Sequence, residues 1–102
     1  MILVRMVFQA KFGKAGELAA AFKAFGSSGA MPGAQVRVFT DLSGPFDTVV
    51  QEIEVESLDA YQRSQAAMFA DPKMRDLLGK TGDLIASGHK EYYTIEFQQD
   101  RR

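Results

Sequence analysis

The 102-residue chain contains no cysteine, no tryptophan and no asparagine, and it has only one histidine. Without cysteine there is no disulfide framework, no zinc–thiolate cluster and no thiol nucleophile. Without asparagine there is no acceptor for N-glycosylation. A lone histidine, His89, does not make a convincing metal site either. We therefore expect no metal and no cofactor.

The chain also lacks an excess of either charge and a long hydrophobic run. Its 12 basic and 13 acidic residues give a net charge of -1. This balance provides neither a basic footprint for nucleic acid nor a polybasic patch for lipid. The apolar opening, residues 1–8, is interrupted by Arg5 and is too short for a signal or a membrane span. We expect a cytoplasmic protein whose partners include neither nucleic acid nor membrane.

The chain does contain apolar residues that recur at regular short intervals. The composition, 46% hydrophobic and 25% charged, is typical of a globular domain, which we place at residues 1–98 with a tail at 99–102. Periods of two and of 3.6 residues distinguish strands from helices. They predict strand, helix, strand, strand, helix and strand at residues 2–9, 14–25, 35–40, 46–56, 57–79 and 90–98.

Helix and turn signals refine these bounds. Ser57 is a suitable N-cap, and Asp71-Pro72 is a second start signal within the long helix. A further short helical turn is expected to carry Leu84 and Ile85 before Ser87-Gly88 breaks the chain. Each helix has one apolar stripe, so both can cover the same face of one sheet. Right-handed crossovers then predict an α+β, ferredoxin-like βαββαβ sandwich with a four-stranded antiparallel sheet, the first and third strands central.

Alternation along the predicted strands gives each side of the sheet its own residues. The side assigned to the helices is almost wholly apolar, with Gln51 among Val4, Met6, Phe8, Val36, Val38, Val49, Ile53, Val55, Tyr93, Ile95 and Phe97. The other side mixes apolar and charged residues: Leu3, Val7, Phe39, Val50 and Tyr92 with Arg5, Arg37, Glu52, Glu54 and Glu96.

This second face is too apolar to be left in water. Burying one large apolar side chain contributes roughly 1.5–3 kcal/mol. Several of them together approach the largest patch that a soluble monomer leaves exposed. A second copy of the sheet packed on this face would cover it. We therefore predict a homodimeric α/β barrel with the helices outside.

Charged groups inside such a barrel need partners, because an unpaired buried ion costs several kcal/mol. One interpretation is a structural ion-pair network or a solvated face. The other is a ligand cavity between the two sheets, with a wall formed by Arg5, Arg37, Phe39, Val50, Glu52, Tyr92 and Glu96. Both interpretations remain open. His89 is a weaker candidate, because an imidazole can act as a general base but an exposed loop histidine is the simpler interpretation.

Several short segments resemble a known superfamily, the dimeric α+β barrel proteins, and within it the NIPSNAP-like and antibiotic-biosynthesis-monooxygenase-like proteins. They follow the opening strand and span nearly the whole chain: residues 12–18 (FGKAGEL), 40–46 (TDLSGPF), 52–58 (EIEVESL), 71–72 (DP) and 91–93 (EYY). The resemblance implies a homodimer. It implies less about chemistry, since the superfamily includes cofactor-free oxygenases, haem-degrading enzymes and dehydratase-like members.

Two functional hypotheses follow. The first is a homodimeric α/β-barrel protein that binds a small organic molecule between the two sheets. The second is a cofactor-independent monooxygenase that acts on an aromatic or quinol-like substrate. The chain departs from the oxygenases in having no tryptophan and no pairing of aromatic and histidine residues.

Overall fold

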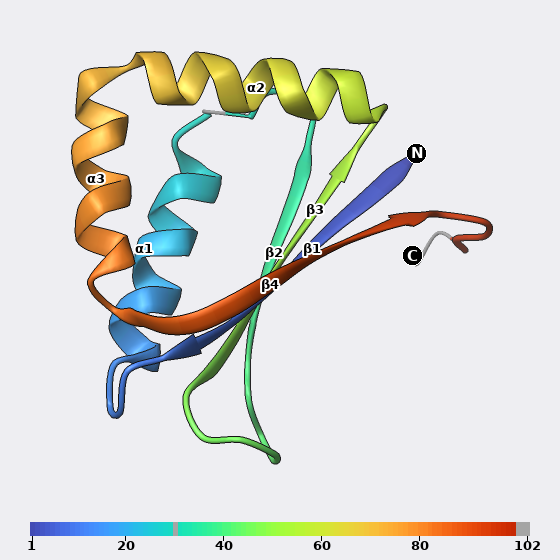
Figure 1. Cartoon of the computed structure of the whole chain (residues 1–102). Helices are drawn as coiled ribbons and strands as arrows, with labels where there is room; N and C mark the ends of the chain where they lie inside the picture. The colour runs from blue at the N-terminus through green and yellow to red at the C-terminus, as the bar shows by residue number, and fades with distance from the viewer. Residues whose placement is uncertain (30, 100–102) are drawn as a thin grey trace.

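The structure, a computed structural model that describes residues 1–29 and 31–99, is one antiparallel sheet with helices on a single face (Figure 1). This is the predicted α+β, ferredoxin-like fold. Along the described part of the chain the elements are β1 (Ile2–Ala10), α1 (Ala15–Ser27), β2 (Gln35–Thr40), β3 (Thr48–Val55), α2 (Leu58–Ala70), α3 (Pro72–Gly82) and β4 (Ile85–Thr94).

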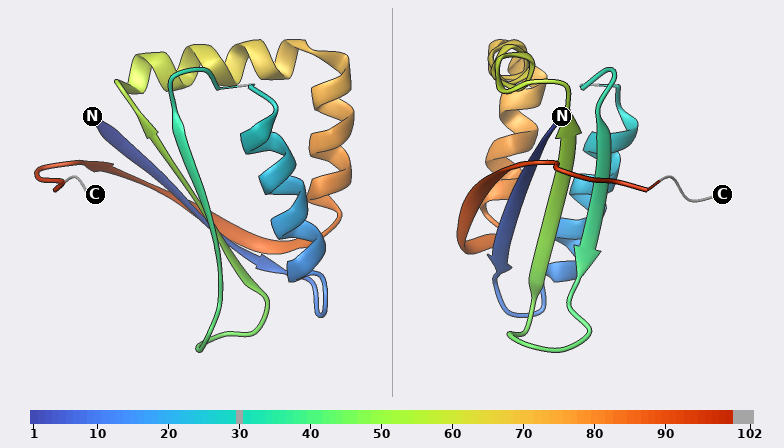
Figure 2. Two further views of the ribbon diagram at one scale, coloured as in Figure 1. Left: turned by 180° about the vertical axis from the view of Figure 1, so that it is seen from behind. Right: turned by 90° about the vertical axis from the view of Figure 1, so that its right-hand side faces the viewer.

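The sheet has the strand order β2-β3-β1-β4, so β1 and β3 are central, as predicted. All three pairings are antiparallel. The helices cover one face, and the opposite face carries none of them (Figure 2). The sheet of the single chain is open and does not close into a barrel. No helix among residues 1–29 and 31–99 is long and apolar enough to cross a membrane.

The predicted start signals of the long helical segment are both used. The Ser57 hydroxyl accepts a hydrogen bond from the backbone N–H of Ala60 at the start of α2. The Asp71 carboxylate then accepts one from the N–H of Lys73, and Pro72 occupies the first turn of α3. The cap and the proline end one helix and begin another, so α3 turns sharply away from α2 (Figure 1).

The core lies between the helix-bearing face of the sheet and the helices. Cross-strand neighbours share a face, and the register pairs Val4 with Ile53 and Phe8 with Val49. One group of buried residues surrounds Val4, Ile53 and Tyr61, and a second surrounds Leu18 and Val49. The predicted helix-facing residues of the first three strands are thereby confirmed.

The last strand differs from its prediction. It runs from Ile85 to Thr94, whereas residues 90–98 were expected, and the expected helical turn at Leu84 and Ile85 is wrong. Ser87-Gly88 suggested a turn, but Gly88 lies within β4, opposite Phe8. A Cβ at Gly88 would lie 2.8 Å from Phe8 Cδ1 and 3.1 Å from the Val7 carbonyl oxygen. The glycine is there because the Phe8 ring needs its space.

This shift reverses the predicted faces of the last strand. Tyr93 pairs with Leu3 and therefore lies on the open face, whereas Tyr92 pairs with Val4 and lies on the helix side. The predicted alternation was wrong because residues 95 and 97, which seemed to extend the apolar face, follow the end of β4. The tail predicted at residues 99–102 lies, except for Gln99, outside the described residues. Its division from a 1–98 domain stays a prediction.

Replacing Gly88 with alanine should destabilise the fold. The new methyl group would overlap the Phe8 ring, and overpacking of this kind costs about 1–3 kcal/mol. Gly79→Ala is the matched control, because a Cβ at this helical position meets nothing within 4 Å. It should raise the free energy of unfolding by about 0.5–1 kcal/mol. Urea denaturation of both variants measures the difference. Equal effects at the two positions would show that Phe8 does not require the glycine.

Candidate functional site

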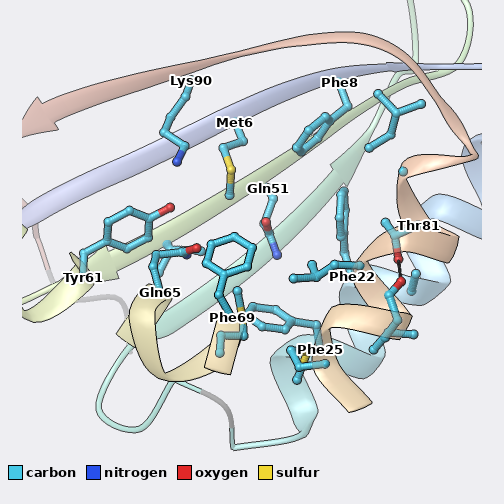
Figure 3. A pocket seen from close by; sticks show the side chains of 18 residues that line it. Met6, Phe8, Phe22, Phe25, Gln51, Tyr61, Gln65, Phe69, Thr81 and Lys90 are labelled. Atoms are coloured by element: carbon cyan, nitrogen blue, oxygen red, sulfur yellow. Dashed lines mark hydrogen bonds between the residues drawn. The ribbon is translucent and has the colours of Figure 1, made fainter. Parts of the chain in front are cut away.

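A cavity of about 290 Å³ lies between the helix-bearing face of the sheet and the three helices (Figure 3). Strands β1, β3 and β4 form its floor, and α1, α2 and α3 form its walls. The lining residues are Met6, Phe8, Ala21, Phe22, Phe25, Gln51, Ile53, Tyr61, Gln65, Met68, Phe69, Met74, Leu77, Leu78, Thr81, Gly82, Ile85 and Lys90. The size is close to the lower end of the range for small-molecule sites, roughly 300 Å³.

Large apolar side chains line the cavity without being covered by the chain. Phe69 of α2 is 55% exposed and Leu77 of α3 is 38% exposed, although both border the cavity. Among the residues of α3, only Thr81 is buried. An apolar ligand would remove this area from water, at about 25 cal/mol per Å².

Tyr61 places a polar group inside this apolar space. Its side chain comes from α2, points into the cavity (Figure 3) and is 2% exposed. Its hydroxyl makes no hydrogen bond among the residues that the structure describes, although the Lys90 ammonium is near enough to interact with it electrostatically. A buried polar group without a partner costs about 1–3 kcal/mol, so an orphaned hydroxyl in a native fold requires an explanation.

Gln51 is a second polar group on the cavity floor. It belongs to β3, lies opposite Met6 and Val38, and is 4% exposed. Its amide projects into the cavity (Figure 3). The sequence already showed this glutamine on an otherwise apolar strand face. In the structure that amide becomes a donor and acceptor available to a ligand.

Lys90 supplies the positive charge of the cavity. It lies on the edge strand β4, opposite Met6, and its Nζ is 5.3 Å from the ring centre of Tyr61 and 5.9 Å from that of Tyr92. Within the described part of the chain no carboxylate forms an ion pair with it. Partial desolvation is the largest influence on its pKa and lowers it, but the Tyr61 and Tyr92 hydroxyls together raise the pKa above its ordinary value. Lys90 is therefore a cation at neutral pH and not a base.

The open face of the sheet carries a row of alternating charges. The register sets Arg37, Glu52, Arg5 and Glu91 side by side across all four strands. Arg37 Nη2 donates to Glu52 Oε1 at 2.8 Å, and Arg5 Nη1 donates to Glu91 Oε1 at 2.8 Å. Arg5 Nε is 3.6 Å from Glu52 Oε2. The row is an ion-pair network in which opposite charges alternate.

The residues predicted to form a ligand wall divide into two groups. Arg5, Arg37 and Glu52 lie in the charged row, and Phe39 and Val50 lie in the next row of the same face. Tyr92 does not belong with them, because it faces the helices. Glu96 does not either, because it follows the end of β4. Glu91 and Tyr93 are the residues of β4 that lie on the open face beside Arg5 and Leu3.

His89 is not the loop residue that the sequence predicted. It lies within β4, opposite Val7 on the open face, and its Nε2 is 3.3 Å from Glu91 Oε2. The Arg5 guanidinium, which donates to Glu91, is the main reason that the pKa of Glu91 lies below its ordinary value. The Glu91 carboxylate in turn raises the pKa of Tyr93. His89 thus stands at one end of the ion-pair network.

Comparison with solved structures identifies the same fold elsewhere. An uncharacterized NIPSNAP domain protein from Burkholderia xenovorans is 17% identical over 98% of this chain and 100% of that chain, with a TM-score of 0.82. A NIPSNAP family protein with unknown function from Agrobacterium tumefaciens is 23% identical over 91% and 86%, with a TM-score of 0.80. A putative antibiotic biosynthesis monooxygenase from Deinococcus radiodurans is 15% identical over 100% and 99%, with a TM-score of 0.72.

These likenesses confirm the NIPSNAP-like and monooxygenase-like resemblance at the level of the fold. No family model matches the chain. No curated protein matches it either. The sequence identities are low, so the activity has to be argued from the chain's own residues.

Replacing Tyr61 with phenylalanine should leave the free energy of unfolding unchanged or raise it by up to about 1 kcal/mol, because the variant removes an unpartnered buried hydroxyl. Thr81→Val is the control within the same cavity, since the Thr81 hydroxyl donates to the Leu77 carbonyl oxygen at 2.9 Å. That variant should lose about 0.5–1.5 kcal/mol. Chemical denaturation gives both values. A loss for Tyr61→Phe as large as that for Thr81→Val would mean that the Tyr61 hydroxyl has a partner in the fold.

Proposed function

We propose that this protein is a homodimer that binds a small, mainly apolar organic molecule in the cavity between each sheet and its helices. The observation that carries the proposal is the Tyr61 hydroxyl, which is buried without a hydrogen bond to the described residues at a cavity lined mainly by apolar side chains. Native folds seldom bury a donor without a partner, and a ligand in this cavity would provide one. The half-exposed Phe69 and Leu77 support the same conclusion, because a ligand would cover them.

The homodimer is supported by the composition of the open face. Val7 and Val50 form an apolar row with Phe39, directly beside the charged row. A two-fold axis that runs along the strands would set the charged row of one copy against the reversed row of the other. Each cation would then face an anion, and complementary charges of this kind fix the register of an interface. Arg37 Nε, buried without a partner among the described residues, would gain an acceptor.

The predicted cavity between two sheets would exist only in such a dimer, and it stays a prediction. Arg5, Arg37 and Glu52 already form ion pairs within one chain. A ligand that replaced these ion pairs would gain little binding free energy, because the charges already have partners. The helix-side cavity, by contrast, contains polar groups that the chain leaves unpaired. We therefore assign ligand binding to the helix side and dimerisation to the open face.

The alternative, a cofactor-independent monooxygenase, also stays a prediction. Oxidation of a quinol by oxygen needs a group that removes a phenolic proton. The residues that line the cavity include no aspartate, glutamate or histidine, and Lys90 is protonated. Binding, which requires no such base, is the function that the cavity supports best.

Ligand binding can be tested with 2-naphthamide, a neutral two-ring molecule, by isothermal titration calorimetry. Ala21 lines the cavity, whereas its neighbour Ala20 does not. Ala21→Phe should fill part of the cavity and weaken binding by about tenfold or more, because removing the burial of a few methylene-sized groups costs more than 1.4 kcal/mol. Ala20→Phe should bind as the unchanged protein does. Absence of binding to the unchanged protein, or equal binding by both variants, would remove this cavity as the site.

Dimerisation can be tested by replacing Val50 with aspartate. The new carboxylate would lie between Phe39 and Val7, where a second sheet would bury it without a partner. Light scattering at micromolar concentration should show a dimer for the unchanged protein and a monomer or aggregate for the variant. Ala20→Asp adds the same charge on the exposed side of α1 and should stay dimeric. A monomeric unchanged protein would refute the dimer, and a dimeric Val50→Asp would refute this interface.

A further inference from the structure

The cavity is polar at one end and apolar at the other. Tyr61 and Lys90 lie at one end of the cavity, Gln51 lies near its middle, and Phe22 and Phe25 lie toward the opposite end (Figure 3). The single charge at the polar end is the Lys90 ammonium. No aspartate or glutamate lines the cavity to neutralise it.

From this arrangement we infer that the ligand is an apolar carboxylic acid, bound as its carboxylate with the head at Lys90 and Tyr61 and the apolar body directed toward Phe22 and Phe25. The inference rests on the proposed binding function and specifies the chemical class of the ligand. A carboxylate has two acceptor oxygens, so one can accept from the Lys90 ammonium and the other from the Tyr61 hydroxyl. The hydroxyl that the fold leaves without a partner would then have one.

The position of Lys90 indicates where the polar head of the ligand would bind. Its side chain is exposed on the edge strand, whereas Tyr61 is fully buried beside it. A carboxylate at the rim keeps contact with solvent and avoids the cost of complete desolvation. Its apolar body enters the cavity, where the uncovered area of Phe69 and Leu77 lies.

The charge of the site favours a monoanion over a phosphate. Only one cation lines the cavity, and Gln51 and Tyr61 are neutral donors. A dianionic phosphate ester would bring one negative charge more than the site can neutralise, and no second lysine or arginine lines the cavity to offset it. The Lys90 pKa, which lies above its ordinary value, keeps the cation present across the physiological range.

The experiment compares three ligands with one apolar body: 2-naphthoate, 2-naphthamide and 2-naphthyl phosphate, titrated calorimetrically at low ionic strength. We expect 2-naphthoate to bind about tenfold more tightly than the amide, which corresponds to 1.4 kcal/mol and to one charge-assisted hydrogen bond at a partly exposed site. The phosphate should bind more weakly than the carboxylate. Because the ammonium is partly exposed, the preference for 2-naphthoate should decrease at high salt.

Two variants locate the head group. Lys90→Met keeps the aliphatic stem and should reduce the preference for 2-naphthoate over 2-naphthamide to about twofold or less. Tyr61→Phe should weaken the binding of 2-naphthoate about threefold. Amide binding should stay nearly unchanged in Lys90→Met, which also shows that this variant folds. Lys73→Met, on the exposed first turn of α3 outside the cavity, removes the same charge and should keep the full preference.

The outcomes separate this inference from the proposed function. If the carboxylate and the amide bind equally, the cavity is a ligand site but not for an acid, and only the inference is overturned. The same holds if Lys73→Met has the effect expected of Lys90→Met. If the phosphate binds most tightly, the carboxylate assignment is wrong. If none of the three molecules binds, the inference and the proposed function both fail.

Discussion

The pairing register of β1 with its two neighbours is the constraint on which the rest of the molecule depends. In an antiparallel pair, opposite residues share a face, so a shift of one residue would move every side chain to the other side. With Val4 opposite Ile53 and Tyr92, the even-numbered residues of β1 face the helices. The same register sets Arg5 beside Glu52 and Glu91 on the other face. The core, the cavity and the ion-pair network are three consequences of this one alignment.

The two faces of the sheet differ in how their polar groups are paired. On the open face each charged side chain of the row from Arg37 to Glu91 forms an ion pair with a neighbour of opposite sign, and the buried Arg37 Nε is left without a hydrogen bond among the described residues. On the helix side the polar groups are few, and Tyr61 lies buried without a partner. Satisfied ion pairs in partly exposed positions contribute modestly to stability and suit an interface that must be aligned. An unsatisfied hydroxyl lowers stability, so its presence is better explained by binding than by folding.

The break between α2 and α3 sets the direction of one wall of the cavity. The Asp71 cap and Pro72 turn α3 away from α2, and Leu77 of α3 borders a space that the chain does not fill. Thus two adjacent residues with ordinary local functions, a cap and a helix-starting proline, set the direction of the helix that carries Leu77.

The sequence by itself determined the order of elements, the central position of β1 and β3, and the two faces of the first three strands, because these follow from local periodicity and turn chemistry. It also indicated the break at Asp71-Pro72 and the charged face with Arg5, Arg37 and Glu52. Only the tertiary structure decided the bounds and faces of β4, because an edge strand takes its register from its neighbour and Gly88 serves the Phe8 ring. It alone brought Tyr61, Gln51 and Lys90 together from α2, β3 and β4, since a cavity depends on how separate elements pack, and no local pattern records that distance.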